Sequence, residues 1–140
     1  MPFLYSKGTE YALRCLQILA RNPGSPKTVV SLCQEAQLPE HFTRKMLQPL
    51  VRIGILKSHR GPGGGFVFST PPDQITLRQV IEGIEDKPVK LEGLLGGHAP
   101  AHIEKKWVEI CDLAEHLLDE TTLAELTGDD LRLELNVTDS

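Results

Sequence analysis

The chain contains 140 residues, of which 40% are hydrophobic and 24% are charged, and its formal net charge is −4. This length suffices for a buried core, and there is no apolar run of membrane-spanning length and no signal-peptide pattern, so we expect a soluble, cytoplasmic protein. The charge is divided unevenly. Residues 1–70 hold nine Lys/Arg and three Asp/Glu, a net charge of +6. Residues 71–140 hold six Lys/Arg and sixteen Asp/Glu, a net charge of −10. The basic half suits a polyanionic partner, which the overall acidity conceals.

The first predicted helix spans residues 6–21, because apolar residues recur there at helical spacing and Asn22-Pro23-Gly24 follows as a stop signal. A short second helix is capped by Thr28 and breaks at residues 37–39, and a longer third helix begins with Pro39 in its first turn. The apolar positions expected to face the core are Tyr11, Ala12, Cys15, Leu16, Ile18 and Leu19 in the first helix, Val29, Leu32, Cys33 and Ala36 in the second, and Phe42, Met46, Leu47 and Leu50 in the third.

The third helix is expected to run to Gly54 and to present a polar, donor-rich face. Its interior Pro49 removes one backbone hydrogen bond, so we expect a kink or a break after Gln48. Only one acid, Glu40, accompanies the outward donors, which suit base edges and phosphates better than an ordinary solvated face. We therefore expect residues 40–48 to read a DNA groove. The outward residues are His41, Thr43, Arg44, Lys45, Gln48 and Arg52.

Glycine-rich residues 61–65 join two short apolar stretches and predict a β-hairpin. Phe66 and Phe68 share one face at the strand period of two, so that face can pack on a core. Glycines tolerate positive φ and carry no side chain, so the backbone can approach a phosphate chain closely. Taken alone this is an ordinary hairpin. Because a short helix, a tight turn and a longer helix precede it, we interpret it as the wing of a winged helix-turn-helix, with the basic pair His59 and Arg60 beside its tip.

The acidic half begins with a short core helix, for which Thr76 and Gln79 form a capping box. A loop over residues 86–101 follows, and a long helix comes after it. The apolar stripe of the long helix comprises Ile103, Trp107, Ile110, Cys111, Ala114, Leu117 and Leu118. A helix of this length needs a partner surface, so we expect homodimerisation through the stripe, the alternative being that it covers the protein's own core.

The predicted fold is mainly α-helical with a small β-wing, and the chain divides into four parts. Residues 1–85 form a winged helix-turn-helix DNA-binding domain, residues 86–101 a sensor-type loop or linker, residues 102–128 the dimerisation helix with a short final helix capped at Thr122, and residues 129–140 an acidic tail.

Three segments resemble the bacterial Rrf2 family of winged-helix regulators over about residues 3–127. They read SKGTEYALRCLQILA, LPEHFTRKMLQPLVRIGILKSHRGPGGGFVFSTPPDQITLRQVIEGIE and KKWVEICDLAEHLLDETTLAEL, and the wing after a "GIL" helix end is highly specific. The resemblance implies a homodimeric transcription factor, usually a repressor, on a pseudo-palindromic operator in double-stranded DNA, with an unknown small-molecule or protein effector. It places in the grooves Thr43, Arg44, Lys45 and Gln48 of the third helix and His59 and Arg60 of the wing. Gly61, Gly63 and Gly64 are expected to bring the wing backbone close to the DNA.

Many relatives hold an iron–sulfur cluster on three cysteines in the loop before the long helix, but residues 86–101 contain no cysteine. Cys15, Cys33 and Cys111 are each interpreted as small buried residues, so the chain is closer to the clusterless, CymR-like branch. We expect no cofactor and no metal.

Two weaker signals remain open. His98 and His102 are four residues apart, a spacing that places two imidazoles on one metal if both residues are helical, although Gly97 and Pro100 disfavour this. Glu10 occupies the position from which some relatives supply a carboxylate to a cluster, and otherwise it is a first-turn acid that favours the helix dipole.

Enzymatic functions are disfavoured by the motifs that are missing. The glycines at 61–65 lack the lysine and hydroxyl residue of a phosphate-binding P-loop, and no recognisable nucleophile or acid–base pair occurs. Two alternatives to a DNA-binding regulator remain. One is a protein-interaction module of the same fold that acts through its acidic half, and the other is a metal- or thiol-responsive sensor that uses ligands outside a cysteine loop.

Overall fold

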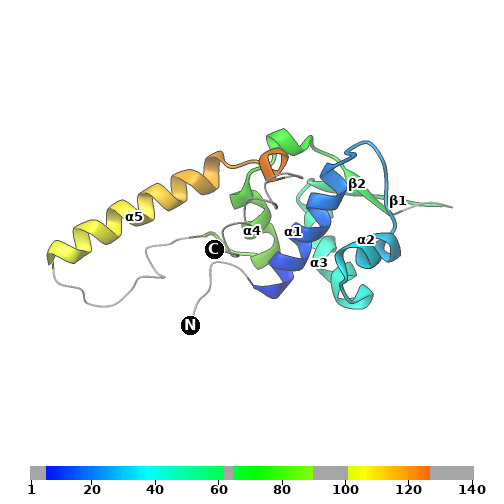
Figure 1. Cartoon of the computed structure of the whole chain (residues 1–140), viewed down its shortest axis with the longest axis horizontal. Coiled ribbons are helices and arrows are strands. Elements are labelled where there is room, and N and C mark those ends of the chain that lie inside the picture. Colours follow the sequence, from blue (N-terminus) through cyan, green and yellow to red (C-terminus); the bar gives the residue numbers. More distant parts are fainter. Residues whose placement is uncertain (1–5, 62–64, 90–100, 127–140) are drawn as a thin grey trace, which may run out of the picture.

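The computed structural model describes residues 6–61, 65–89 and 101–126. Helices gather around α1, a two-stranded hairpin extends from one end of the body, and the long helix α5 projects from the other (Figure 1). This mainly helical fold with a small antiparallel wing confirms the predicted fold class. In chain order the elements are α1 (Lys7–Ala20), α2 (Val29–Ala36), α3 (Glu40–Arg52), β1 (Leu56–His59), β2 (Gly65–Phe68), the 3₁₀ turn η1 (Pro72–Gln74), α4 (Leu77–Glu85), α5 (Ala101–Glu120) and the 3₁₀ turn η3 (Leu123–Leu126).

Three helices begin at hydroxyl caps, as local sequence predicts. The Ser6 hydroxyl accepts from the amide of Thr9, and the Thr28 hydroxyl accepts from the amide of Ser31 at 3.0 Å. At α4 the reciprocal capping box is complete, because Thr76 accepts from the amide of Gln79 and donates its own amide to the Gln79 side chain. Each cap satisfies backbone groups that a helix start leaves unpaired.

The main core lies where α1 meets α2, α3, α4 and the hairpin. The apolar side of α1 is buried as predicted, apart from the partly buried Tyr11. The side chains of this core that are at most 1% exposed are Ala12, Cys15, Leu16, Leu19, Leu32, Leu47, Leu50, Leu56, Ile75 and Val80. Because α3 and the hairpin both pack on this core, the candidate groove-reading elements share one rigid support.

The buried face of α3 is rotated from the expected one. Thr43, expected to face outward, is fully buried, whereas Phe42, expected to face the core, is 39% exposed and stacks edge-on against Tyr11. The reason is the helical period, since Leu47 and Leu50 set a buried stripe whose preceding position is 43. The expected break at Pro49 is also wrong, because α3 continues unbroken to Arg52.

The hairpin pairs β1 with β2 in antiparallel register, with Leu56 opposite Phe68. Toward the turn end of the hairpin, Phe66 donates its amide to the carbonyl of Lys27 at 2.8 Å and accepts from the Lys27 amide at 3.0 Å. Gly65 sits against this bridge with φ +153, and a Cβ there would lie 1.9 Å from the Lys27 carbonyl oxygen. The first hairpin glycine, Gly61, also has positive φ, at +103. The hairpin is therefore attached to the segment before α2 by backbone contacts that only glycine permits.

The long helix α5 has two apolar faces with different environments. Cys111 and Leu118 are buried against Ile81 of α4, with Ala114 half-buried beside them. The prediction that these three α5 residues form a dimer interface is wrong, because they pack against the protomer's own core. Four other members of the predicted stripe are exposed within this chain, namely Ile103, Trp107, Ile110 and Leu117.

A carboxylate joins the start of α1 to the end of α4. Oε2 of Glu85 accepts from the Thr9 hydroxyl at 2.6 Å, the Ser6 hydroxyl at 2.7 Å and the Ser6 amide at 3.1 Å. Partial burial opposes the charged form, but these three hydrogen bonds outweigh it and hold the pKa of Glu85 below its ordinary value of 4.5.

Replacing Glu85 by Ala is expected to lower the free energy of unfolding by about 1 to 2 kcal/mol at neutral pH, because hydrogen bonds to a charged acceptor are lost. A lowered folded-state pKa contributes stability above the unfolded-state pKa and loses it as the pH falls through the folded value. The difference between the wild type and E85A should therefore shrink in acid, as measured by urea unfolding from roughly pH 8 to pH 3. D112A removes an exposed carboxylate of α5 and should show no such trend. A difference independent of pH would contradict the role of the charged carboxylate.

Candidate nucleic-acid interface

Three of the four predicted groove-reading residues of α3 are accessible. Arg44, Lys45 and Gln48 are exposed on the side of the helix away from the core. Arg44 pairs with Glu40 one turn earlier at 3.4 Å, but both side chains are about half exposed, so a DNA base or phosphate can replace this partner at little cost. Thr43 is excluded by its burial. Its hydroxyl has no hydrogen-bond partner among the described residues.

The wing begins directly after α3, which fixes its position. The Ile55 amide donates to the Leu50 carbonyl at 3.0 Å, and the Ser69 amide donates to the Ile55 carbonyl at 2.9 Å. His59 and Arg60 are exposed at the far end of β1, and Gly61 follows them. Gly63 and Gly64, also predicted to contact DNA, lie outside the described residues.

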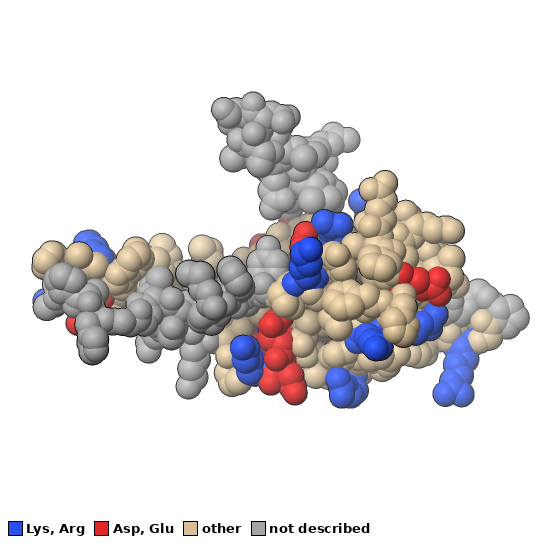
Figure 2. Space-filling model, turned by 90° about the horizontal axis from the view of Figure 1, so that it is seen from below, with Lys and Arg blue, Asp and Glu red and all other residues tan. Residues whose placement is uncertain are grey.

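The face seen from the side of α3 is rich in cations. Figure 2 shows Lys and Arg side chains spread over the body and reaching the wing end, with patches of acidic groups among them. A positively charged surface attracts a phosphate backbone without sequence preference, and α3 carries side-chain donors of the kind that bind base edges.

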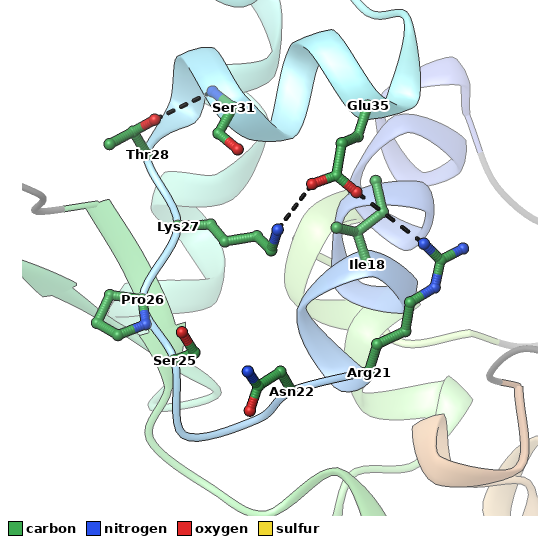
Figure 3. A pocket seen from close by; sticks show the side chains of 9 residues that line it. All are labelled: Ile18, Arg21, Asn22, Ser25, Pro26, Lys27, Thr28, Ser31 and Glu35. Atoms are coloured by element: carbon green, nitrogen blue, oxygen red, sulfur yellow. Dashed lines mark hydrogen bonds and ion pairs between the residues drawn. The ribbon is translucent and has the colours of Figure 1, made fainter.

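A hollow of about 450 Å³ lies between the end of α1 and the start of α2 (Figure 3). The carboxylate of Glu35 pairs with Lys27 at 2.7 Å and with Arg21 at 4.0 Å, and the capped N-terminus of α2 lies along the same side of the hollow as Glu35. Sequence reasoning missed Lys27, whose only local signal was its position before the Thr28 cap. Its backbone bonds to the wing at Phe66, and its ammonium group is paired with Glu35 of α2.

The cysteines do not fit an iron–sulfur cluster, which needs several converging thiolates. They are buried in three different helices, with Cys15 on α1, Cys33 on α2 and Cys111 against α4. Burial, reinforced by Cys33, raises the pKa of the Cys15 thiol to about 12, so it stays protonated and is a poor ligand. Segment 86–101 contributes no cysteine.

The other candidate ligands are also dispersed. Glu10 forms an ion pair with Arg14 at 2.9 Å in the first turn of α1, and His102 is exposed at the start of α5. His98 lies outside the described residues. Within the ranges that the structure covers, His, Cys, Asp and Glu form no group of three or more that could hold a metal ion. Over the same ranges, every helix is too short or too polar to cross a membrane.

The order of two helices followed by a two-stranded wing is that of the winged helix-turn-helix class. The profile of the Rrf2 family, described as iron-dependent transcriptional regulators, matches residues 5–129. The chain therefore belongs to the Rrf2 family.

Individual relatives agree with this assignment. The chain is 35% identical over 119 residues to the transcriptional regulator CymR of Bacillus subtilis, covering 84% of this chain and 85% of that one. It is 26% identical over 141 residues to the regulator IscR of Cereibacter sphaeroides, covering 92% and 89%. The solved structure of B. subtilis CymR, described as the global cysteine regulator of that organism, superposes with a TM-score of 0.76 at 29% identity, covering 91% of this chain and all of that one.

Proposed function

We propose that the protein is a cytoplasmic, homodimeric repressor that binds a pseudo-palindromic operator in double-stranded DNA. The observation that carries this proposal is the exposed donor face of α3 beside the wing. In this arrangement Arg44, Lys45 and Gln48 enter the major groove, and His59 and Arg60 reach the adjacent minor groove.

The two basic residues of α3 have different roles in this proposal. The guanidinium of Arg44 can form a bidentate contact with guanine and so carries sequence preference, while Lys45 is a point charge that suits a phosphate. The wing arginine suits narrowed A·T segments, where the negative potential is concentrated.

The dimer is supported by the first half of α5. Each residue from 102 to 110 is exposed, and Ile103, Trp107, Ile110 and Leu117 lie along one side at spacings of four, three and seven residues. Soluble monomers seldom expose an apolar stripe on a projecting helix, and spacings of three and four are typical of helix pairing. A second copy of α5 offers a complementary surface. Two winged domains then face two half-sites.

We propose further that the regulator works without an iron–sulfur cluster. The buried cysteines support this, because Cys15 and Cys33 lie in the main core whereas Cys111 lies between α5 and α4, and an unidentified small molecule or protein then supplies the signal.

The DNA-binding proposal predicts that R60A weakens binding by about 1 to 3 kcal/mol and lowers the slope of log affinity against log salt by about one. The probe is a duplex selected by the wild-type protein from a randomised pool, and the measurement is a titration at several salt concentrations. K105A, which removes an exposed cation from α5, should bind as the wild type does. Failure to select any duplex, or binding insensitive to salt, would favour the protein-interaction module instead.

A further inference from the structure

Arg78 lies where three parts of the chain meet. It belongs to α4, and its side chain is only 20% exposed. Its guanidinium donates to Asp119 and to the Glu115 carbonyl of α5, to Glu82 on its own helix at 3.3 Å, and to the Val89 carbonyl at 3.0 Å. One planar group therefore contacts α4, α5 and the segment that leaves α4.

The segment after α4 is held at both backbone groups of one residue, Val89. The Val89 amide donates to Oε2 of Glu82 at 2.8 Å, and the same oxygen accepts from Arg78. Arg78, Glu82 and the Val89 backbone thus form a closed ring of hydrogen bonds. The chain enters residues 90–100 from a point fixed beside α5.

Directional bonds matter here because the apolar contact under α5 is small. Its buried members are Ile81, Cys111 and Leu118. Apolar contacts of this kind are not directional and permit a helix to roll or slide, whereas a guanidinium bonded on several edges constrains rotation and translation together. At the end of α5 the chain is also attached by its backbone, since the Leu77 amide donates to Thr121 at 2.8 Å.

The length of α5 amplifies any change at this joint. Residue 103 lies about 20 Å along the helix from the Arg78 contacts, at 1.5 Å per residue, so a rotation of about 10° displaces it by about 3.5 Å. The rise of one base pair is about 3.4 Å. A small rotation at Arg78 is therefore comparable to one base-pair step at the far end of the helix.

We propose that Arg78 is a positioning residue that fixes the angle of α5 to the winged domain and thereby the half-site spacing that the dimer accepts. This inference rests on the proposed function.

The first experiment measures the angle without DNA. Spin labels are attached at Gln34→Cys on α2 and Lys105→Cys on α5, both exposed, and labelled protein is diluted into unlabelled protein so that only the intrachain distance is observed. The native cysteines are buried and react slowly. The distance distribution should be narrow in the wild type and clearly broader or shifted in R78M. R14M removes an ion pair confined to α1 and should leave the distribution unchanged.

The second experiment measures spacing with duplexes that carry the selected site, the same site with one base pair inserted or deleted at its centre, or a single half-site. We expect the wild type to lose at least about tenfold in affinity, about 1.4 kcal/mol, when the spacing changes. R78M should lose affinity for the original spacing and discriminate less than about threefold between spacings, with unchanged half-site binding. R78K keeps the positive charge but lacks the planar guanidinium with its several N–H donors. It should resemble R78M if the geometry of those donors matters.

Each outcome decides between the inference and the proposed function. If the wild type selects no duplex, the proposed function fails. The distances between the spin labels still test whether Arg78 fixes the angle of α5 to the winged domain. If R78M keeps both the narrow distance distribution and the sharp spacing preference, Arg78 has no positioning role. An equal loss for all spacings and for the half-site would indicate a general structural role and would also overturn the inference. Should R78M fail to fold, D119A removes the Asp119 side-chain partner on α5 while keeping Arg78, and it should also broaden or shift the distance distribution.

Discussion

Replacing Gly65 by Ala is expected to lower the free energy of unfolding by about 3 to 5 kcal/mol. The new Cβ would lie 1.9 Å from the Lys27 carbonyl oxygen and 2.6 Å from the Thr28 Cα, so backbone rather than a side chain must move. The shift breaks both hydrogen bonds between Lys27 and Phe66 and releases the wing from the segment before α2. Urea unfolding at neutral pH measures the loss.

Substitutions at two other glycines distinguish backbone strain from the contact with Lys27 as the cause of this loss of stability. Gly61 has a φ of +103 with no atom within 4 Å of an added Cβ, so G61A tests backbone strain alone and should cost about 1 to 2 kcal/mol. Gly24 also has free space, and its φ is outside the region that disfavours side chains, so G24A should change stability by less than about 0.5 kcal/mol. Equal effects at positions 61 and 65 would show that contact with Lys27 contributes nothing.

Replacing Trp107 by Asp is expected to dissociate the proposed dimer, raising its dissociation constant at least about 100-fold, because a charge would enter an apolar helix seam. Within one chain Trp107 is 37% exposed, so the substitution should leave the fold of the protomer intact. Affinity for a two-half-site duplex should fall with the dimer, whereas half-site binding should not. Light scattering measures the oligomeric state, and circular dichroism checks the fold.

K105D places the same carboxylate on the opposite side of α5 and should leave the oligomeric state unchanged. A wild-type protein that is monomeric at micromolar concentration, or a W107D protein that remains dimeric, would refute the α5 seam.

The features that the sequence predicted correctly depend on neighbours a few residues away. The hydroxyl caps at Thr28 and Thr76 each use an amide three residues on, and the hairpin follows from alternating apolar residues around glycines. The order of two helices and a wing follows from such local signals, which is why the winged fold could be predicted. The groove contacts of Arg44 and Arg60 remain predictions, because exposure alone does not identify a DNA partner.

The predictions that were wrong concern helix faces, where the sequence allows more than one side of a helix to be buried. The helical period allows either Phe42 or Thr43 to face inward, and only the packing of α3 on the rest of the core decides that Thr43 is buried. Likewise, the stripe on α5 is continuous in sequence, but α4 covers Cys111 and Leu118 and leaves Trp107 exposed.

By itself, the sequence determined the helix starts, the hairpin and the separation of a basic half from an acidic one, because each depends on residues close in the chain or on composition. Only the tertiary structure decided which α5 residues belong to the protomer's own core, that Gly65 must pass the Lys27 backbone, and that Arg78 joins α4, α5 and Val89. These contacts join residues 11 to 41 positions apart, and a pattern of side-chain types does not specify which distant partners will meet.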